Sequence, residues 1–386
     1  MSKATKITIN ITTPSYYPEI NGLSIVVQNN VKALIDLGYN VNLLTFIGGV
    51  SLYGEMIYTF NIVGNGRLFN KINGEIESYK NKLIELSDIS KINIYHGWHC
   101  WTTNIALDSN IKNIFQIVYS HGIGFSTMEP LFLRILRRFL YFGQKKIIKR
   151  YLRLLDGMIY ISHDYNHPRC YDLIKFNKNK YFLNNPSPNR FEILNNSNDI
   201  DLRDKIISSK KNKLFINISN FEKIKNQSFL IKLINGSKHD VNLIFIGSKS
   251  TLYLEELKTY NNTFSNSHRI TFLTGLSDYS TNYLLKNADC FLFASKNDFV
   301  PLVLIEANKF KLPFISFMTA DTKREGGFFV LNNSQYKTKY NMICELSKDK
   351  LEAIGNKGYD FFTNNNTYDK YKIDISKIIN DISYEQ

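Results

Sequence analysis

Two carboxylates separated by seven residues are the side chains of this 386-residue chain that are best spaced to hold a hydroxyl-rich ligand. Asp298 and Glu306 belong to the segment ASKNDFVPLVLIEANKFKLPFI (294–315), in which we expect a buried strand, a loop with the first acid and an apolar helix with the second. A carboxylate on an apolar helix is costly without a partner, and a ribose would provide one. A structural alternative stays open, in which Asp298 caps the helix and Glu306 pairs with a nearby lysine.

The start of this expected helix is also suited to bind an anion. Pro301 is a good first helical residue, and the backbone amides of Leu302 and Val303 would then open the helix without partners inside it. Free amides at a helix N-terminus attract phosphate groups. A diphosphate could therefore dock between the two acids.

A second polar group follows the expected strand KLFINIS (213–219) and consists of Ser219, Asn220, Glu222 and Lys225. A lysine at the end of a strand in a parallel sheet is placed to contact a ligand, because ligands bind beyond the carboxyl ends of such strands. An ordinary solvated lysine is the better interpretation for Lys223 and the poorer one for Lys225.

Two features of the first half of the chain also lie just after an expected strand. His121 ends the segment NIFQIVYSHG (113–122) beside Gly122, and Asn21 and Gly22 lie between an expected strand and an expected helix. Glycine permits close approach of a backbone to a phosphate, although a simple turn is nearly as good an explanation for this loop.

A metal centre is not predicted. His96, His99 and Cys100 are close in sequence but have no further spaced ligands. The four cysteines are scattered and form no Cys-x-x-Cys pair, which indicates neither a zinc site nor a disulfide framework and fits a reducing compartment.

The elements that position these residues alternate between short apolar strands and longer helical patterns. Such alternation predicts parallel sheets covered by helices. It restarts after NNPSPNRF (184–191), a turn-rich segment that we interpret as a linker. The expected strands are 6–12, 41–46, 92–97, 113–122 and 157–162 before the linker, and 213–219, 241–247, 269–275, 289–295 and 312–317 after it.

The order of these segments resembles that of the family 4 retaining glycosyltransferases. The acid, seven residues, acid spacing of 298–306 is similar to the signature of that family, in the variant with proline at its fourth position. Further segments that match in order are TPSYYPEINGLSIVVQNNVKALIDLGYNVNLLT (13–45), IVYSHG (117–122), DGMIYIS (156–162), YFLNNPSP (181–188) and NISNFEKIKNQSFLIKLI (217–234). The combination is specific, whereas each segment alone is a weak signal.

The resemblance implies a role for each of these residues. Asp298 would contact the transferred sugar, Glu306 the nucleotide ribose, Lys225 and the amides of Leu302 and Val303 the diphosphate, and His121 the reacting end, with Asn21, Gly22 and Asn220 as further binding residues. Two positions depart from the family. Asp298 is one methylene shorter than the usual Glu, and Asn220 stands where the family has Arg, which removes one charge-assisted hydrogen bond, worth about 1.5 to 3 kcal/mol.

The resemblance also implies an α/β fold of the glycosyltransferase B type, with two Rossmann-like doubly wound domains that face a central cleft. We expect an acceptor-side domain over 1–188, a nucleotide-sugar-binding domain over 189–364, and a C-terminal helix over 365–386 that crosses back to the first domain.

The implied activity is a metal-independent, retaining transfer of a hexose or N-acetylhexosamine from a nucleoside diphosphate sugar, with UDP-sugars first. The acceptor would be a saccharide or a lipid-linked saccharide, in the synthesis of a bacterial surface polysaccharide or lipopolysaccharide. No cofactor is expected. A sugar-nucleotide epimerase on the same scaffold and a catalytically inactive partner subunit remain alternatives.

Composition and charge bear on where the protein works. The formal charge of +14 attracts polyanions, but no nucleic-acid-binding module is recognisable. No signal peptide or membrane-spanning stretch is expected, so a cytoplasmic location is predicted. The segment FLRILRRFLYFGQKKIIKRYLR (132–153) would form a basic amphipathic surface. This surface could bind the anionic inner face of the cell membrane, or it could be a solvated face over the core of the first domain.

Overall fold

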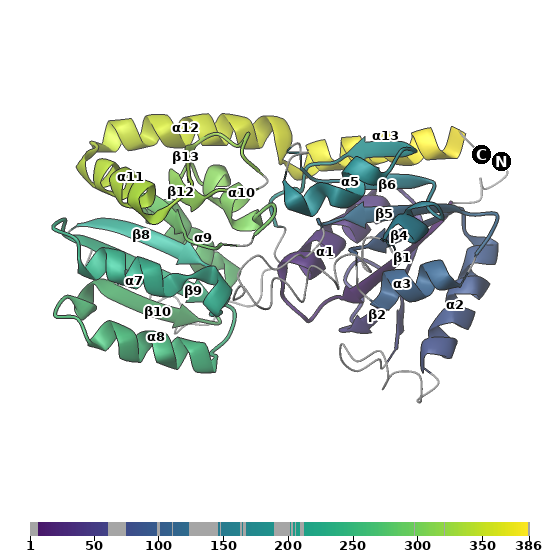
Figure 1. Ribbon diagram of the computed structural model, residues 1–386, viewed down its shortest axis with the longest axis horizontal. Coiled ribbons are helices and arrows are strands. Elements are labelled where there is room, and N and C mark those ends of the chain that lie inside the picture. Colours follow the sequence, from purple (N-terminus) through teal and green to yellow (C-terminus); the bar gives the residue numbers. More distant parts are fainter. Residues whose placement is uncertain are drawn as a thin grey trace. The chain divides into compact units, whose positions relative to one another are not determined.

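The computed structural model describes residues 7–60, 75–98, 101–109, 111–122, 146, 148–162, 164, 167–188, 201, 204, 206–208, 212–296, 298–319 and 321–384. The chain forms two compact units. Unit 1 comprises Met1–Pro186 and Tyr368–Gln386, and unit 2 comprises Ser187–Thr367. The C-terminal helix α13, Tyr368–Tyr384, therefore belongs to unit 1 and packs there on helix α1, Gly22–Asp36 (Figure 1).

Unit 1 is built on a parallel sheet with the strand order β3-β2-β1-β4-β5-β6-β7. Every pairing between neighbours is parallel, as the alternation of strands and helices predicts. The strands are β1 Thr8–Ser15, β2 Asn40–Ile47, β3 Met56–Thr59, β4 Ile92–His96, β5 Phe115–Ser120, β6 Gly157–Tyr160 and β7 Asn179–Phe182. Besides α1 and α13, the helices are α2 Glu75–Ile89, α3 Trp101–Asp108, α5 Tyr171–Lys175 and the 3-10 helix η2 Pro168–Cys170.

Unit 2 repeats this plan with the strand order β10-β9-β8-β11-β12-β13. Its strands are β8 Lys213–Ile218, β9 Val241–Gly247, β10 Ile270–Thr274, β11 Cys290–Phe293, β12 Phe314–Phe317 and β13 Gly327–Val330. Its helices are α7 Gln227–Asn235, α8 Leu252–Asn262, α9 Asp278–Asn287, α10 Leu302–Lys309, α11 Asn333–Glu345 and α12 Lys348–Asn365, with the 3-10 helices η3 Lys223–Lys225 and η4 Ser267–Arg269.

Buried side chains pack on both faces of the unit 2 sheet. One cluster joins the strands to α7, α8 and α11, and the other joins them to α9 and α10. Helices on both faces of a parallel sheet define a doubly wound domain. The prediction of two Rossmann-like α/β domains is confirmed.

The same reversal of strand order occurs in both sheets, between β1 and β4 in unit 1 and between β8 and β11 in unit 2. After β1 or β8 the chain continues toward one edge of its sheet, and after β4 or β11 it continues toward the opposite edge. The two connections therefore diverge at this point. A crevice opens at such a point beyond the carboxyl ends of the strands, where ligands bind in this class of sheet.

Close backbone packing holds α10 in unit 2. Gly355 in α12 lies against Lys311, two residues after the end of α10, and a methyl group placed on Gly355 would lie 1.8 Å from the Lys311 carbonyl oxygen. Lys311 itself has a left-handed backbone, with φ 56°. The glycine lets α12 pack directly on the end of α10 and so fixes the helix that carries Glu306.

In the part of the chain that the structure describes, no helix combines the length and the apolar composition needed to cross a membrane.

Candidate functional site

The Lys225 ammonium and the Asp298 carboxylate meet at the point in unit 2 where the strand order reverses. Lys225 ends η3, in the loop after β8, and Asp298 lies in the loop after β11. The Lys225 Nζ is 2.9 Å from Oδ1 and 3.0 Å from Oδ2 of Asp298. About a quarter of each side chain is exposed, so the pair is reachable from solvent.

Hydrogen bonds between the two loops keep this pair together. Asn226 has a left-handed backbone, with φ 58°, which asparagine adopts more readily than most residues. Its Nδ2 donates to the Ala294 carbonyl at 3.2 Å. The Lys296 amide donates to the Ile224 carbonyl at 3.3 Å. The loop that carries Lys225 is thereby joined to the loop that carries Asp298.

Glu306 lies at the same edge of the sheet but is almost completely buried, with 3% of its surface exposed. It belongs to α10, which begins at Leu302; Pro301 is the N-cap and not the first helical residue that the sequence suggested. Pro301 provides no side-chain cap, so the amides of Leu302 and Val303 are the first two of the helix. Asp298 does not cap α10, since its carboxylate pairs with Lys225.

Asn220 is held by neutral partners. Its Oδ1 accepts a hydrogen bond from the Ser248 hydroxyl at 2.8 Å, and its carbonyl accepts one from Gln227 Nε2 at 2.8 Å. The same Gln227 nitrogen donates to the Ser219 hydroxyl at 3.0 Å. Lys223, by contrast, is largely exposed and lies 3.5 Å from Glu256. Lys225 is therefore the lysine of η3 that lies at the strand reversal, and Lys223 is a surface residue.

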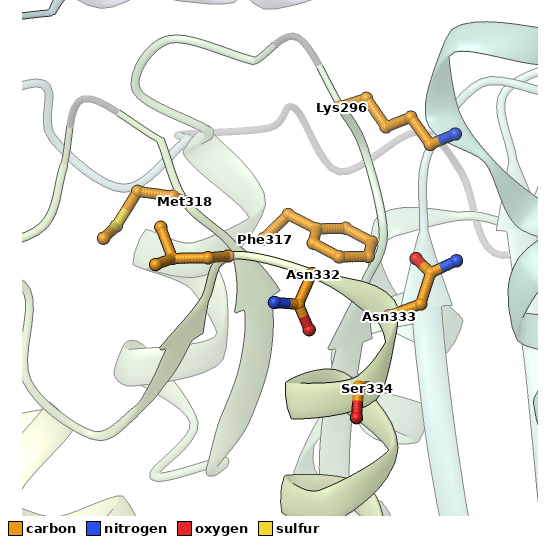
Figure 2. A pocket seen from close by; sticks show the side chains of 7 residues that line it. Lys296, Phe317, Met318, Asn332, Asn333 and Ser334 are labelled. Carbon is orange, nitrogen blue, oxygen red and sulfur yellow. The ribbon is translucent and has the colours of Figure 1, made fainter.

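A hollow of about 600 Å³ adjoins this region of unit 2. Figure 2 shows Lys296, from the loop after β11, and Asn332, Asn333 and Ser334, which lie at the start of α11. The remaining lining residues of the hollow are Phe317, Met318 and Leu331. Lys225, Asp298 and Glu306 do not line it, so the hollow lies beside the ion pair and does not contain it.

In unit 1, Asn21 caps helix α1. Its Oδ1 accepts from the Ser24 amide at 2.9 Å and its own amide donates to the Ser24 hydroxyl at 3.0 Å, which completes a capping box. The Asn21 Nδ2 donates to the Ser15 hydroxyl at 3.2 Å. Gly22 is the first helical residue, and a methyl group there would meet no atom within 4 Å. The loop has a structural role, and Gly22 leaves open space above it.

His121 follows β5 and contacts a second histidine. Its Nε2 is 3.2 Å from Nδ1 of His96, the last residue of β4. The ring of Tyr119 stacks on both, at 4.7 Å from the His96 ring and 4.9 Å from the His121 ring. Burial, with the positive charge of Arg169, lowers the pKa of His121 to about 3. Burial likewise lowers the pKa of His96, so both rings are neutral at neutral pH.

Other predicted features lie partly outside the described residues. His99, Cys100, residues 132–145 and residue 147 are among these. From the end of the basic segment, Arg150 pairs with Asp108 at 3.2 Å and Lys149 is exposed. No group of three or more potential metal ligands occurs among the residues that the structure describes.

Comparison with known proteins agrees with this architecture. Residues 198–325 match the family described as glycosyl transferases group 1. The fold is that of a glycosyltransferase of the B type. No curated protein matches the chain by sequence.

Solved structures with this glycosyltransferase B fold cover nearly the whole chain. A glycosyltransferase from Rickettsia africae has 15% identity and a TM-score of 0.74, over 99% of this chain and 100% of that chain. HepE from Anabaena, solved with UDP and glucose, has 14% identity and a TM-score of 0.70, over 97% of this chain and 100% of that one. WaaG, a glycosyltransferase involved in lipopolysaccharide biosynthesis, has 11% identity and a TM-score of 0.67, over 94% and 97%.

Within the glycosyltransferase B fold of this chain, the predicted residues fall into two groups. Asp298, Lys225, Glu306, Asn220 and the start of α10 gather at one edge of unit 2, whereas His121, Asn21 and Gly22 lie in unit 1. The sequence reasoning missed Asn226 and Gln227, which organise the loop after β8. Asn226 could have been recognised from the sequence, because asparagine adopts a left-handed backbone more readily than most residues and here directly precedes a helical pattern.

Proposed function

We propose that the chain is a retaining glycosyltransferase that uses a nucleoside diphosphate sugar. The observation that supports this most is the Lys225–Asp298 pair at the strand reversal of unit 2, beside the first amides of α10 and the buried Glu306. A cation and free amides suit a diphosphate, and carboxylates suit sugar and ribose hydroxyls.

The ion pair leaves donor capacity for a substrate. A lysine ammonium has three N–H donors, and two of those of Lys225 are directed at the oxygens of Asp298. The third remains to bind an oxygen of the leaving diphosphate. In this proposal Lys225 and the amides of Leu302 and Val303 stabilise the charge that develops as the diphosphate departs. A metal ion is then not required for this step.

Asp298 would position the transferred sugar and Glu306 the ribose, while His121 would contribute from unit 1 to the reacting end. The family resemblance supports these roles. Retention of configuration follows from the resemblance: the acceptor hydroxyl attacks from the face that the diphosphate leaves.

UDP-sugars are the donors that we propose first. HepE, which shares the fold, was solved with UDP and with UDP-glucose. The acceptor that we propose is a saccharide or a lipid-linked saccharide, in lipopolysaccharide or surface polysaccharide synthesis. The involvement of WaaG, which shares the fold, in lipopolysaccharide biosynthesis supports this choice. The Asn220 amide, bonded to Ser248, contributes no positive charge, which favours a slower transfer than in enzymes with arginine there.

A screen of UDP-, GDP- and ADP-sugars tests the proposal, with binding measured by calorimetry and turnover by NMR of the products. We expect one nucleotide class to bind and its sugar to be transferred or slowly hydrolysed with retained configuration. An epimerised nucleotide sugar as the only product would instead identify an epimerase. Absence of binding for all three classes would identify an inactive partner subunit.

We also propose a cytoplasmic enzyme that associates with an anionic membrane surface through residues 132–153. Each lysine or arginine near an anionic leaflet contributes about 1 kcal/mol. Sedimentation with liposomes of neutral lipid, and of the same lipid with anionic lipid added, tests this. Equal binding to the two preparations would remove the membrane role and leave the transferase proposal intact.

A further inference from the structure

A continuous line of polar side chains runs through unit 1 from the C-terminal helix to His121. Tyr371 of α13 accepts a hydrogen bond from Nδ2 of Asn30 in α1, at 3.1 Å. The Oδ1 of Asn30 lies 3.3 Å from Nε2 of His96, whose Nδ1 lies 3.2 Å from Nε2 of His121. Asn30 and His96 are fully buried, and Tyr371 is 1% exposed, so water does not substitute for these partners.

The direction of the hydrogen bonds in this line is set by the amide of Asn30. Its Nδ2 donates to the Tyr371 hydroxyl at 3.1 Å. An amide nitrogen only donates and an amide oxygen only accepts. Tyr371 therefore holds the nitrogen of the amide on its own side and leaves the oxygen on the side of His96.

This fixes the amide of Asn30 and, through it, both histidines. With Nδ2 directed at Tyr371, Asn30 offers its carbonyl oxygen to His96, whose Nε2 must carry the proton. A neutral imidazole has one N–H, so His96 Nδ1 accepts, and Nε2 of His121 must donate to it. The proton of His121 is thereby placed on Nε2, and Nδ1 keeps a lone pair.

The Nδ1 of His121 is the end of the line. No group of the described residues donates a hydrogen bond to it. His121 is partly exposed at the carboxyl end of β5, and Tyr119 stacks against its ring at an interplanar angle of 9°. The ring is therefore held in one orientation, with one acceptor atom available to a ligand.

We propose that Asn30, anchored by Tyr371, is a positioning residue that fixes the tautomer of His121, so that His121 binds a hydroxyl group through Nδ1. An acceptor-only group, such as a phosphate or carboxylate oxygen, finds no proton there. The identity of this hydroxyl, on the transferred sugar or on the attacking saccharide, rests on the transferase function proposed above. The tautomer itself does not depend on that function.

Nitrogen-15 NMR of the histidine rings tests the proposal on the full chain without substrate. The chain has seven histidines, and loss of one set of signals in His96→Gln and in His121→Gln assigns the two rings. We expect protonated Nε2 and unprotonated Nδ1 for His121 and for His96 at pH 7.5. A proton on Nδ1 of His121 would overturn the proposal.

Variants of Asn30 separate positioning from general support of the fold. Asn30→Leu removes the acceptor, and we expect both histidines to become mixtures of tautomers. Asn30→Asp keeps an acceptor for His96 Nε2, and we expect the wild-type tautomers to return. Asn29→Leu is the matched control, because Asn29 is also buried in α1 and its Nδ2 has no hydrogen-bond partner. Unchanged tautomers in Asn30→Leu would refute the role of Asn30.

Tyr371→Phe is a second, milder variant in case Asn30→Leu does not fold. It leaves the Asn30 amide without its anchor, and we expect the amide to turn over and the His121 tautomer to become mixed. A single His121 tautomer in Tyr371→Phe, as in the wild type, would contradict the role of the hydrogen bond from Asn30 Nδ2 to Tyr371. In transfer assays we expect Asn30→Leu to lower kcat about tenfold, the effect of one neutral hydrogen bond, with nucleotide affinity unchanged. If the wild type binds no nucleotide, the transferase proposal is refuted, whereas the proposed tautomer of His121 is not affected.

Discussion

Replacing Lys225 by alanine separates a role in substrate binding from a role in stability, because the structure assigns very different energies to the two. The pair with Asp298 is partly exposed, 22% for the lysine and 24% for the carboxylate. Ion pairs of this kind contribute about 0.2 to 1 kcal/mol to stability. For a domain the size of unit 2, this corresponds to a fall in Tm of at most about 4 °C.

The expected effect on catalysis is much larger. The hydrogen bond of Lys225 to a leaving diphosphate is worth about 1.5 to 3 kcal/mol, which corresponds to a loss of one to two decades in kcat/KM. Steady-state transfer or donor hydrolysis, measured beside a thermal melt, gives both quantities. Lys223→Ala is the matched control, since Lys223 belongs to the same 3-10 helix but is 78% exposed and pairs with Glu256. Equal losses in the two variants, or less than a threefold loss in Lys225→Ala, would refute the assignment.

Three further predictions concern the fold, its pH dependence and the proposed chemistry. Gly355→Ala forces a methyl group against the Lys311 carbonyl and should destabilise unit 2 by at least about 1 to 3 kcal/mol in urea unfolding, whereas Gly22→Ala, in open space, should not lower stability. The pKa of His121 is about 3 in the folded protein and about 6.5 in the unfolded chain. Its contribution to the free energy of unfolding is therefore complete above pH 6.5 and is lost as the pH falls toward 3. Between pH 7.5 and pH 5 the protein should lose roughly 2 kcal/mol of stability for this reason, and His121→Gln should reduce the loss. A pH-independent free energy of unfolding in the wild type would contradict that assignment. Activity should survive EDTA, because the proposed charge stabilisation uses Lys225 and helix amides; loss of activity that Mg²⁺ or Mn²⁺ restores would contradict it.

The strands that the sequence predicts are those with continuous apolar runs. β1, β4, β5, β8, β9 and β11 are buried along most of their length and were placed within a few residues. The three missed strands, β3, β7 and β13, lie at sheet edges and have four residues each. Four residues are too few to show either a long apolar run or a clear alternation. β10 also lies at a sheet edge, but its run of five residues was recognised.

Spacing along the chain predicted Asp298 and Glu306 as a pair, but it could not predict their surroundings. The partner of Asp298 is 73 residues away in the sequence. The bond between Asn30 and Tyr371 joins residues 341 positions apart. Contacts of this kind depend on which helix packs on which face, and neither periodicity nor a local motif encodes that. Asn21 is different, because its capping box with Ser24 is local. Asparagine is a preferred N-cap residue, so this structural role could have been predicted from the sequence.

Calorimetry of nucleotide binding to Glu306→Gln tests the central claim most directly. Glutamine keeps the size of the side chain but removes the charge from a position that is 3% exposed. The account predicts that UDP, or GDP or ADP in its place, binds the wild type and binds Glu306→Gln about 10 to 100 times more weakly, since a charge-assisted hydrogen bond is lost. Glu325→Gln, an exposed change in the same unit, should bind like the wild type. Equal affinity of the wild type and Glu306→Gln, or no binding of any of the three nucleotides, would contradict the account.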